Sequence, residues 1–151
     1  MKPIQEWFDE YAESHQNKTN KTIHWICVPS IFLSVVGLLY SVKFAHGQFY
    51  TLAHIALLLV LFFYIRLSPK MAIGMFFFSI ICLFICSFLE RKLPIPLWQT
   101  SLIIFIIAWI GQFIGHKIEG HKPSFFKDLQ FLLIGPAWLM GFIYRRLGIS
   151  Y

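Results

Sequence analysis

The stretch MAIGMFFFSIICLFICSFL, residues 71–89, has the composition of a membrane-spanning helix. It lacks charged side chains and approaches the ~20 residues that a helix needs to cross a hydrocarbon core. Further apolar stretches lie on both sides of it, at Ile23–Val42, Phe49–Ile65 and Leu97–Gly115. A fifth stretch, Leu129–Tyr144, is shorter and is interrupted by Gly135 and Pro136. It either crosses as a kinked span or enters the membrane and returns.

The composition supports this interpretation. Of the 151 residues, 58% are hydrophobic and 13% are charged, whereas about a quarter of the residues in a soluble domain are charged. We therefore predict an all-α membrane protein, a compact bundle of four to five transmembrane helices in one integral domain over residues 1–151. Within it, residues 1–22 form an interfacial segment, residues 23–144 form the bundle and residues 116–128 form a polar metal-site loop.

The N-terminal segment has the pattern of an amphipathic helix. Apolar side chains recur at helical spacing, at Ile4, Trp7, Phe8 and Tyr11. Acidic and amide side chains occupy the other side, so we expect the helix to lie along the membrane surface. Four residues beyond Tyr11, His15 continues the apolar face and points toward the bundle or the bilayer. Asn20 is a candidate cap for the helix that follows.

Charge gives the expected orientation. Lys and Arg number 13 against seven Asp and Glu, for a net charge of +6. The cations are scattered through short connections and do not form a basic stripe, so nucleic acid is not an expected partner. More loop cations fall on the side that carries the N-terminus, which places the N-terminus and the loop after the fourth span in the cytoplasm. The expected location is a bacterial inner membrane or the endoplasmic reticulum.

Four histidines fall on this cytoplasmic side. His15 and His24 lie near the entrance of the first span, and His116 and His121 follow the fourth. Imidazole nitrogen is a common ligand of transition metals, so these residues predict a metal site at one membrane face.

The end of the fourth span supports such a site. Gln112, His116 and Glu119 stand at i, i+4 and i+7, so a helix projects an amide, an imidazole and a carboxylate from one face. Gln112 and Glu119 are therefore candidate supporting residues. Gly111 and Gly115 form a pair of small residues that allows another helix to approach closely.

Beyond this helix, Gly120 supplies a break that allows His121 to turn back toward the metal. We expect ordinary interfacial roles for the remaining polar residues His46, His54, Lys117 and Lys122. The alternative for the two lysines is to bind the anionic head of a substrate.

Several functions stay open on these residues alone. Imidazole ligands also suit Zn²⁺, which predicts a membrane hydrolase of lipid esters or amides as an alternative. A non-enzymatic membrane scaffold or carrier with interfacial histidines is another. Haem ligation fits less well, because the histidines lie at polar entrances and not in mid-span. The sequence has no Gly-rich phosphate loop, no nucleophilic-serine elbow and no Cys-x-x-Cys pair.

Two stretches carry a resemblance to a known family. YAESHQNKTNKTIHWICVP, residues 11–29, resembles the N-terminal Tyr, His, Asn, His, Pro signature of the 2-hydroxy-fatty-acid dioxygenases, which act in the conversion of phytosphingosine to odd-numbered fatty acids. QFIGHKIEGHKP, residues 112–123, resembles the second signature of that family. With the apolar spans between them, the resemblance covers most of the chain.

The resemblance implies a membrane-embedded Fe(II) enzyme that shortens a 2-hydroxy fatty acid by one carbon, consuming dioxygen and releasing carbon dioxide. Matched by position, it implies that His15, His24 and His116 bind the iron, that Asn20 supports them and that Glu119 is the acidic residue of the second signature. A metal role for His121 rests on its spacing alone. The implied partners are a fatty-acyl lipid, dioxygen and the surrounding membrane lipids.

Overall fold

A computed structural model describes residues 2–44, 50–120 and 131–151. Apart from one isolated bridge between Lys43 and Thr51, the regular structure in these ranges is helical. The helices are α1 (Ile4–Glu13), α2 (Lys18–Tyr40), α3 (Leu52–Leu67), α4 (Pro69–Lys92), α5 (Leu97–Glu119) and α7 (Ile134–Arg146). The all-α prediction is confirmed.

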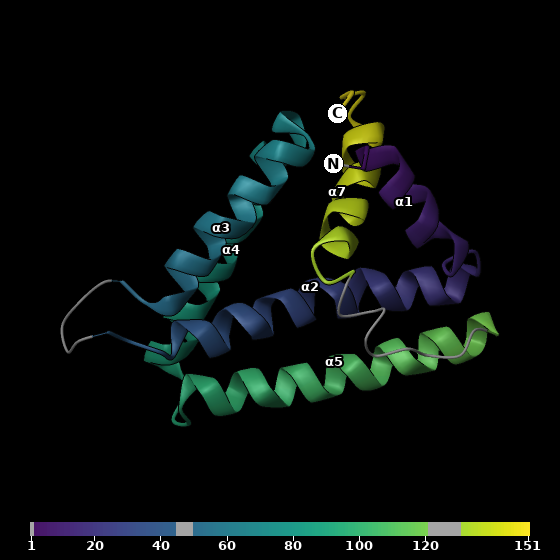
Figure 1. Ribbon diagram of the computed structural model, residues 1–151. Helices are drawn as coiled ribbons and strands as arrows, with labels where there is room; N and C mark the ends of the chain where they lie inside the picture. Colours follow the sequence, from purple (N-terminus) through teal and green to yellow (C-terminus); the bar gives the residue numbers. More distant parts are fainter. Residues whose placement is uncertain (1, 45–49, 121–130) are drawn as a thin grey trace.

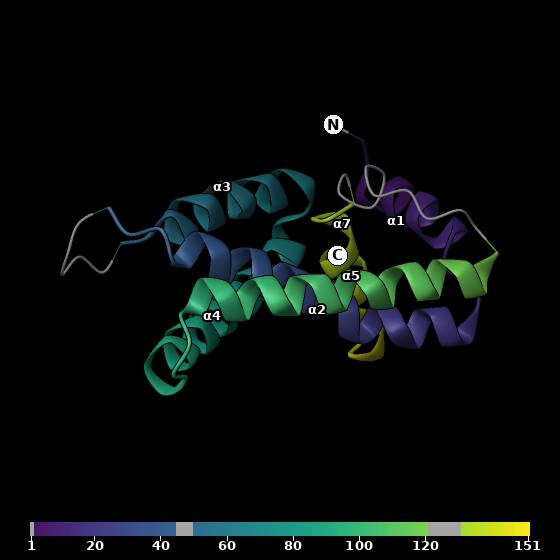
Figure 2. The ribbon, with the colours of Figure 1, turned by 90° about the horizontal axis from the view of Figure 1, so that it is seen from below.

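The helices form a triangle built on the long α2–α5 pair (Figure 1). α2 and α5 lie side by side and run antiparallel, as the second view also shows (Figure 2). The α3–α4 hairpin leaves the C-terminal end of α2 at an angle, while α1 and α7 pack near its N-terminal half. α7 also contacts α4, where the Tyr144 hydroxyl donates to the Lys70 carbonyl at 2.8 Å. The helices thus form three pairs, α2–α5, α3–α4 and α1–α7, which lie at an angle to one another.

Within the described residues, three helices are long and apolar enough to cross a membrane, namely α2, α4 and α5. α3 is a shorter apolar helix of 16 residues. α7 has 13 residues and rises about 20 Å at 1.5 Å per residue, less than a hydrocarbon core of about 30 Å. Of the two alternatives for the fifth stretch, this length favours a segment that does not cross.

The outer faces of the helices are apolar, as a lipid environment requires. Phe62 on α3, Phe77 and Phe84 on α4 and Ile107 on α5 each expose at least 60% of their surface. Soluble monomers seldom expose so much contiguous apolar area, and membrane-facing surfaces do. These exposed apolar side chains therefore agree with the membrane protein that the sequence predicts.

Two helix starts differ from the sequence-based prediction. Asn17, and not Asn20, caps α2, because its side-chain oxygen accepts from the N–H groups of Thr19 and Asn20 at 2.8 and 3.3 Å. Asn20 lies inside the first turn and is buried. Pro136 falls in the first turn of α7, where a missing N–H leaves no helical bond unmade. Gly135 and Pro136 therefore begin this helix instead of kinking it.

Candidate metal centre

Three imidazoles from separate parts of the chain meet at one end of the α2–α5 pair. His15 follows the C-terminal end of α1, His24 lies in the second turn of α2 and His116 lies in the last turn of α5. One ring nitrogen from each residue lies within 4.8 Å of the other two. The residues expose only 1%, 1% and 4% of their surface. The structure thus brings together three histidines that the sequence assigned to one membrane face.

Backbone carbonyls orient two of these rings. His15 Nδ1 lies 2.5 Å from the Tyr11 carbonyl oxygen, and His24 Nδ1 lies 2.9 Å from that of Asn20. A carbonyl oxygen only accepts hydrogen bonds, so each Nδ1 carries the proton and each neutral ring keeps its lone pair on Nε2. Metal-binding histidines commonly have this arrangement, with one nitrogen bonded to the backbone and the other available to the ion.

His15 is also held in its neutral form. Burial lowers the pKa of His15 to about 4, the bond to the Tyr11 carbonyl opposes this shift, and the nearby His116 ring adds to it. At neutral pH the ring is therefore uncharged, as a metal ligand must be. Its Nε2 atom is buried and has no hydrogen-bond partner among the residues that the structure describes. A buried nitrogen of this kind is costly unless a ligand satisfies it.

Aromatic side chains enclose the His15 ring. The Tyr11 ring stacks on it with a centroid separation of 4.1 Å and an interplanar angle of 13°. Trp138 from α7 approaches the same ring at 5.5 Å and packs against Tyr11 at 5.1 Å. The spacing of Tyr11 and His15, four residues apart, is visible in the sequence. The contact with Trp138 joins distant segments, and no sequence motif indicates it.

Glu119 connects the end of α5 to the turn before α2. Its carboxylate accepts from the backbone N–H of Gln16 at 2.7 Å and of Asn17 at 2.9 Å, and from Asn20 Nδ2 at 2.9 Å. Asn20 Nδ2 also donates to the Ser14 carbonyl at 3.1 Å. Glu119 therefore holds the His15 turn against the helix that carries His116, and it does not belong to the imidazole group.

The other candidate residues lie at different places. Gln112 is buried one turn before His116, whereas Lys117 is exposed. His54 is half-buried near the opposite end of α2, beside Thr51. His46, His121 and Lys122, together with most of the predicted loop 116–128, lie outside the described residues.

Fold and site together define an all-helical membrane protein with a buried three-histidine group at one end of its longest helix pair. The chain belongs to the Mpo1-like family, since the family model described as 2-hydroxy-palmitic acid dioxygenase Mpo1-like matches residues 1–147. The family resemblance of the two histidine stretches is thereby confirmed.

One curated relative supports the same assignment. The 2-hydroxy-palmitic acid dioxygenase MPO1 of Saccharomyces cerevisiae is 29% identical over 140 residues, which cover 91% of this chain and 78% of the relative. No solved structure matches the chain significantly.

Proposed function

We propose that this protein is an iron-dependent dioxygenase that shortens 2-hydroxy fatty acids by one carbon, with His15, His24 and His116 as the iron ligands. The observation that carries the proposal is the buried three-histidine group in a chain of the Mpo1-like family. The relative's name supports the reaction class and the substrate class, and the geometry of the three histidines supports the choice of ligands.

The three histidines fit a divalent metal. Two rings direct Nδ1 to the backbone, which leaves Nε2 for an ion, and His15 is neutral at physiological pH. Nitrogens that share one ion at about 2.1 Å lie at most about 4.2 Å apart. The ring nitrogens lie within 4.8 Å of one another in the structure, so a modest inward movement of the rings would let them share one ion. Within residues 2–44, 50–120 and 131–151 the group has three imidazoles and no fourth ligand, which matches a catalytic site better than a structural one.

The overall reaction balances without another reductant. A 2-hydroxy acid and one O₂ give the acid with one carbon fewer, one CO₂ and one water, and the substrate supplies the four electrons that O₂ takes up. Ferrous iron, when bound, would supply open positions that bring a 2-hydroxy acid and O₂ together.

The protein residues hold and shield this site. The imidazoles hold the ion, and the Tyr11 and Trp138 rings cover His15 and exclude water from it. Through its bonds to Gln16 and Asn20, Glu119 holds the end of α5 against the turn that follows His15 and against the start of α2. We place the site on the cytoplasmic side, because the loop cations favour that orientation. The acyl tail then remains among the apolar side chains and lipids while the head group reaches the histidines.

The test is a reaction in lipid nanodiscs. Protein purified without oxygen is expected to contain iron, and with 2-hydroxypalmitate and O₂ it is expected to form pentadecanoic acid and CO₂ in equal amounts. Palmitate, which lacks the hydroxyl group, is the control substrate and should give no product. Absence of a shortened acid across several chain lengths contradicts the proposal. Bound zinc with oxygen-independent hydrolysis of lipid esters or amides would support the hydrolase alternative.

A further inference from the structure

An apolar groove lies between α7 and the first half of α2, and we call it the α2–α7 groove. Its narrow part has a volume of about 80 Å³. Trp25 and Pro29 of α2 line one wall of this part, and one face of α7 lines the other, at Pro136, Leu139, Met140 and Ile143. Trp25 and Ile143 also line a wider part, of about 480 Å³. These two side chains expose 42% and 40% of their surface, so the groove opens to the surroundings.

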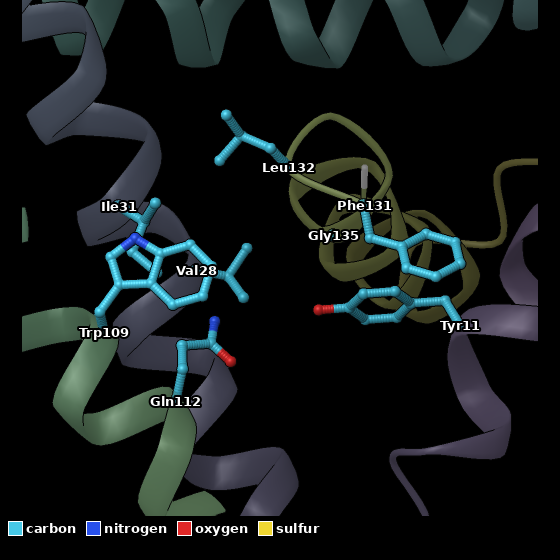
Figure 3. Close-up of a pocket in the computed structure, with 8 residues that line it drawn as sticks. All are labelled: Tyr11, Val28, Ile31, Trp109, Gln112, Phe131, Leu132 and Gly135. Carbon is cyan, nitrogen blue, oxygen red and sulfur yellow. The ribbon is translucent and has the colours of Figure 1, made fainter. Parts of the chain in front are cut away.

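The two parts of the groove differ in what they can hold. Ligand sites commonly measure about 300–1,000 Å³, so the wider part is large enough for a head group. The narrow part suits a slim apolar chain. The pocket beside Tyr11 and Gln112, by contrast, has a volume of about 20 Å³, which is room for about one water molecule (Figure 3). The α2–α7 groove is therefore the better candidate for a ligand of the size of a lipid.

Arg146 lies at the wide end of the groove, next to the apolar Leu147. It is exposed, and no hydrogen bond or ion pair joins it to another residue within the ranges 2–44, 50–120 and 131–151. A guanidinium group binds a phosphate through two parallel N–H bonds. Arg146 and the apolar wall beside it are thus complementary to a molecule with a phosphate head and an acyl chain.

Further cations surround this end of α7. The Tyr144 hydroxyl donates to the Lys70 carbonyl, which ties the turn between α3 and α4 to the last turn of α7. Arg66 and Lys70 flank that turn, and Arg145 precedes Arg146. None of these four cations pairs with an acidic side chain in the described part of the chain, where the ion pairs lie elsewhere. The surface therefore carries an excess of positive charge.

The turn between α3 and α4 follows the second predicted span, so it shares the predicted cytoplasmic side with the N-terminus. The bond between Tyr144 and Lys70 brings the end of α7 to that same side. Anionic lipids give the cytoplasmic leaflet its negative surface potential, and each nearby Lys or Arg adds to their attraction. Charge and location therefore favour the same kind of ligand.

We propose that the α2–α7 groove binds an anionic phospholipid of the surrounding bilayer, with its phosphate at Arg146 and one acyl chain along the face of α7. A 2-hydroxy acid fits this place less well, because its head must reach the histidines. Phe142 lines the wide part of the groove, and Trp138 packs between Phe142 and His15, with ring centroids 4.7 and 5.5 Å away. A head group at Arg146 is thus separated from His15 by aromatic rings.

The experiment is native mass spectrometry of the purified full-length protein in detergent, titrated with dioleoyl-phosphatidylglycerol or with zwitterionic dioleoyl-phosphatidylcholine. It needs neither oxygen nor turnover, so its outcome is independent of the proposed function. The parent should bind one phosphatidylglycerol at least about fivefold more tightly than phosphatidylcholine, as expected when one cation contributes to the attraction. Because a ligand that binds only the folded state stabilises it, phosphatidylglycerol should also raise the unfolding temperature.

Arg146→Gln tests the head group. It should weaken phosphatidylglycerol binding about fivefold, leave phosphatidylcholine binding unchanged and reduce the stabilisation by phosphatidylglycerol. Arg91→Gln is the matched control, because Arg91 is also an exposed arginine in the last turn of a helix. It removes an equal charge away from the groove and should bind both lipids like the parent.

Ile143→Trp tests the acyl chain, because it fills the groove and retains all four cations. It should weaken phosphatidylglycerol binding at least about fivefold, which corresponds to the displacement of one or two methylene groups. Ile107→Trp, on the exposed face of α5, adds the same side chain outside the groove and should have no effect.

Three results would overturn the proposal. The first is equal binding of the two lipids by the parent. The second is an equal loss of phosphatidylglycerol in Arg146→Gln and Arg91→Gln, which would mean that only the total charge of the protein attracts the lipid. The third is displacement of the bound lipid by one equivalent of 2-hydroxypalmitate, which would assign the groove to the substrate.

Discussion

The histidines near the two ends of α2 carry their ring proton on different nitrogens. At the N-terminal end, His24 Nδ1 donates to the Asn20 carbonyl at 2.9 Å. Near the C-terminal end, His54 Nδ1 accepts from the Thr51 backbone N–H at 3.2 Å, in the first turn of α3. The neutral His24 ring therefore has its lone pair on Nε2, while the neutral His54 ring has its proton there. The backbone group that faces Nδ1 thus decides which histidine offers a nitrogen to a metal.

Loss of a ring at the first end should have the largest effect. His24→Ala and His116→Ala each remove one of the three proposed ligands from a buried group that contains no other His, Cys or carboxylate donor among the described residues. Because loss of a supporting residue alone costs about 10- to 100-fold in metal affinity, we expect losses on the order of a hundredfold or more and no detectable turnover. Competition with a chelator, together with iron analysis of the purified variants, measures this.

His54→Ala is the matched variant at the other end. It should retain iron and activity and cost about 1 kcal/mol of stability, since it removes hydrogen bonds at a helix N-terminus and a ring contact with Tyr40. Equal loss of iron in His54→Ala and His24→Ala would contradict the inference that only His24, with its lone pair on Nε2, binds the metal.

Glu119 offers a weaker test, because it acts on the histidines through the backbone. In Glu119→Gln, one amide oxygen replaces a carboxylate that now accepts from Gln16, Asn17 and Asn20. Hydrogen bonds to charged groups contribute about 1.5–3 kcal/mol each when buried, and Glu119 is half-buried. We expect about 2 kcal/mol lower stability and about tenfold weaker iron binding.

Thermal unfolding in nanodiscs and chelator competition give the two values for Glu119→Gln. Glu13→Gln, on the exposed face of α1, removes an equal charge and should change neither. A stability loss without any change in iron affinity would show that the Glu119 bonds hold the fold but do not position His15.

Hydropathy and connectivity were enough to predict the helices and the meeting of the histidines. The prediction of four consecutive spans returned the chain to the face from which it started, and in the structure the start of α2 and the end of α5 lie together. The spacing of Gly111 and Gly115 also indicated a close helix approach. A Cβ atom at Gly111 would lie 2.5 Å from Cys27 Sγ on α2.

The partners of individual polar groups were not predictable in this way. Periodicity assigns Glu119 to the helix face of His116, but it does not show that backbone N–H groups of Gln16 and Asn17 bind it. Asn17 and Asn20 are both good capping residues, and only the folded turn decides between them. Contacts such as Trp138 against His15 arise from packing between distant segments, which single-sequence patterns do not encode.

The smallest expected change in iron affinity concerns one of two glycines in the α2–α5 interface. A Cβ atom at Gly115 would overlap Asn20 Oδ1, and one at Gly37, at the far end of the pair, would overlap Ser101 Oγ. Both alanine variants should lose about 1–3 kcal/mol of stability by overpacking. Only Gly115→Ala displaces the Asn20 side chain and crowds His24, whose Cε1 would lie 3.3 Å from the added Cβ atom, so it alone should weaken iron binding, by roughly three- to tenfold. Equal weakening in Gly37→Ala would show that the metal site senses the packing of the whole helix pair and not the contacts of Asn20.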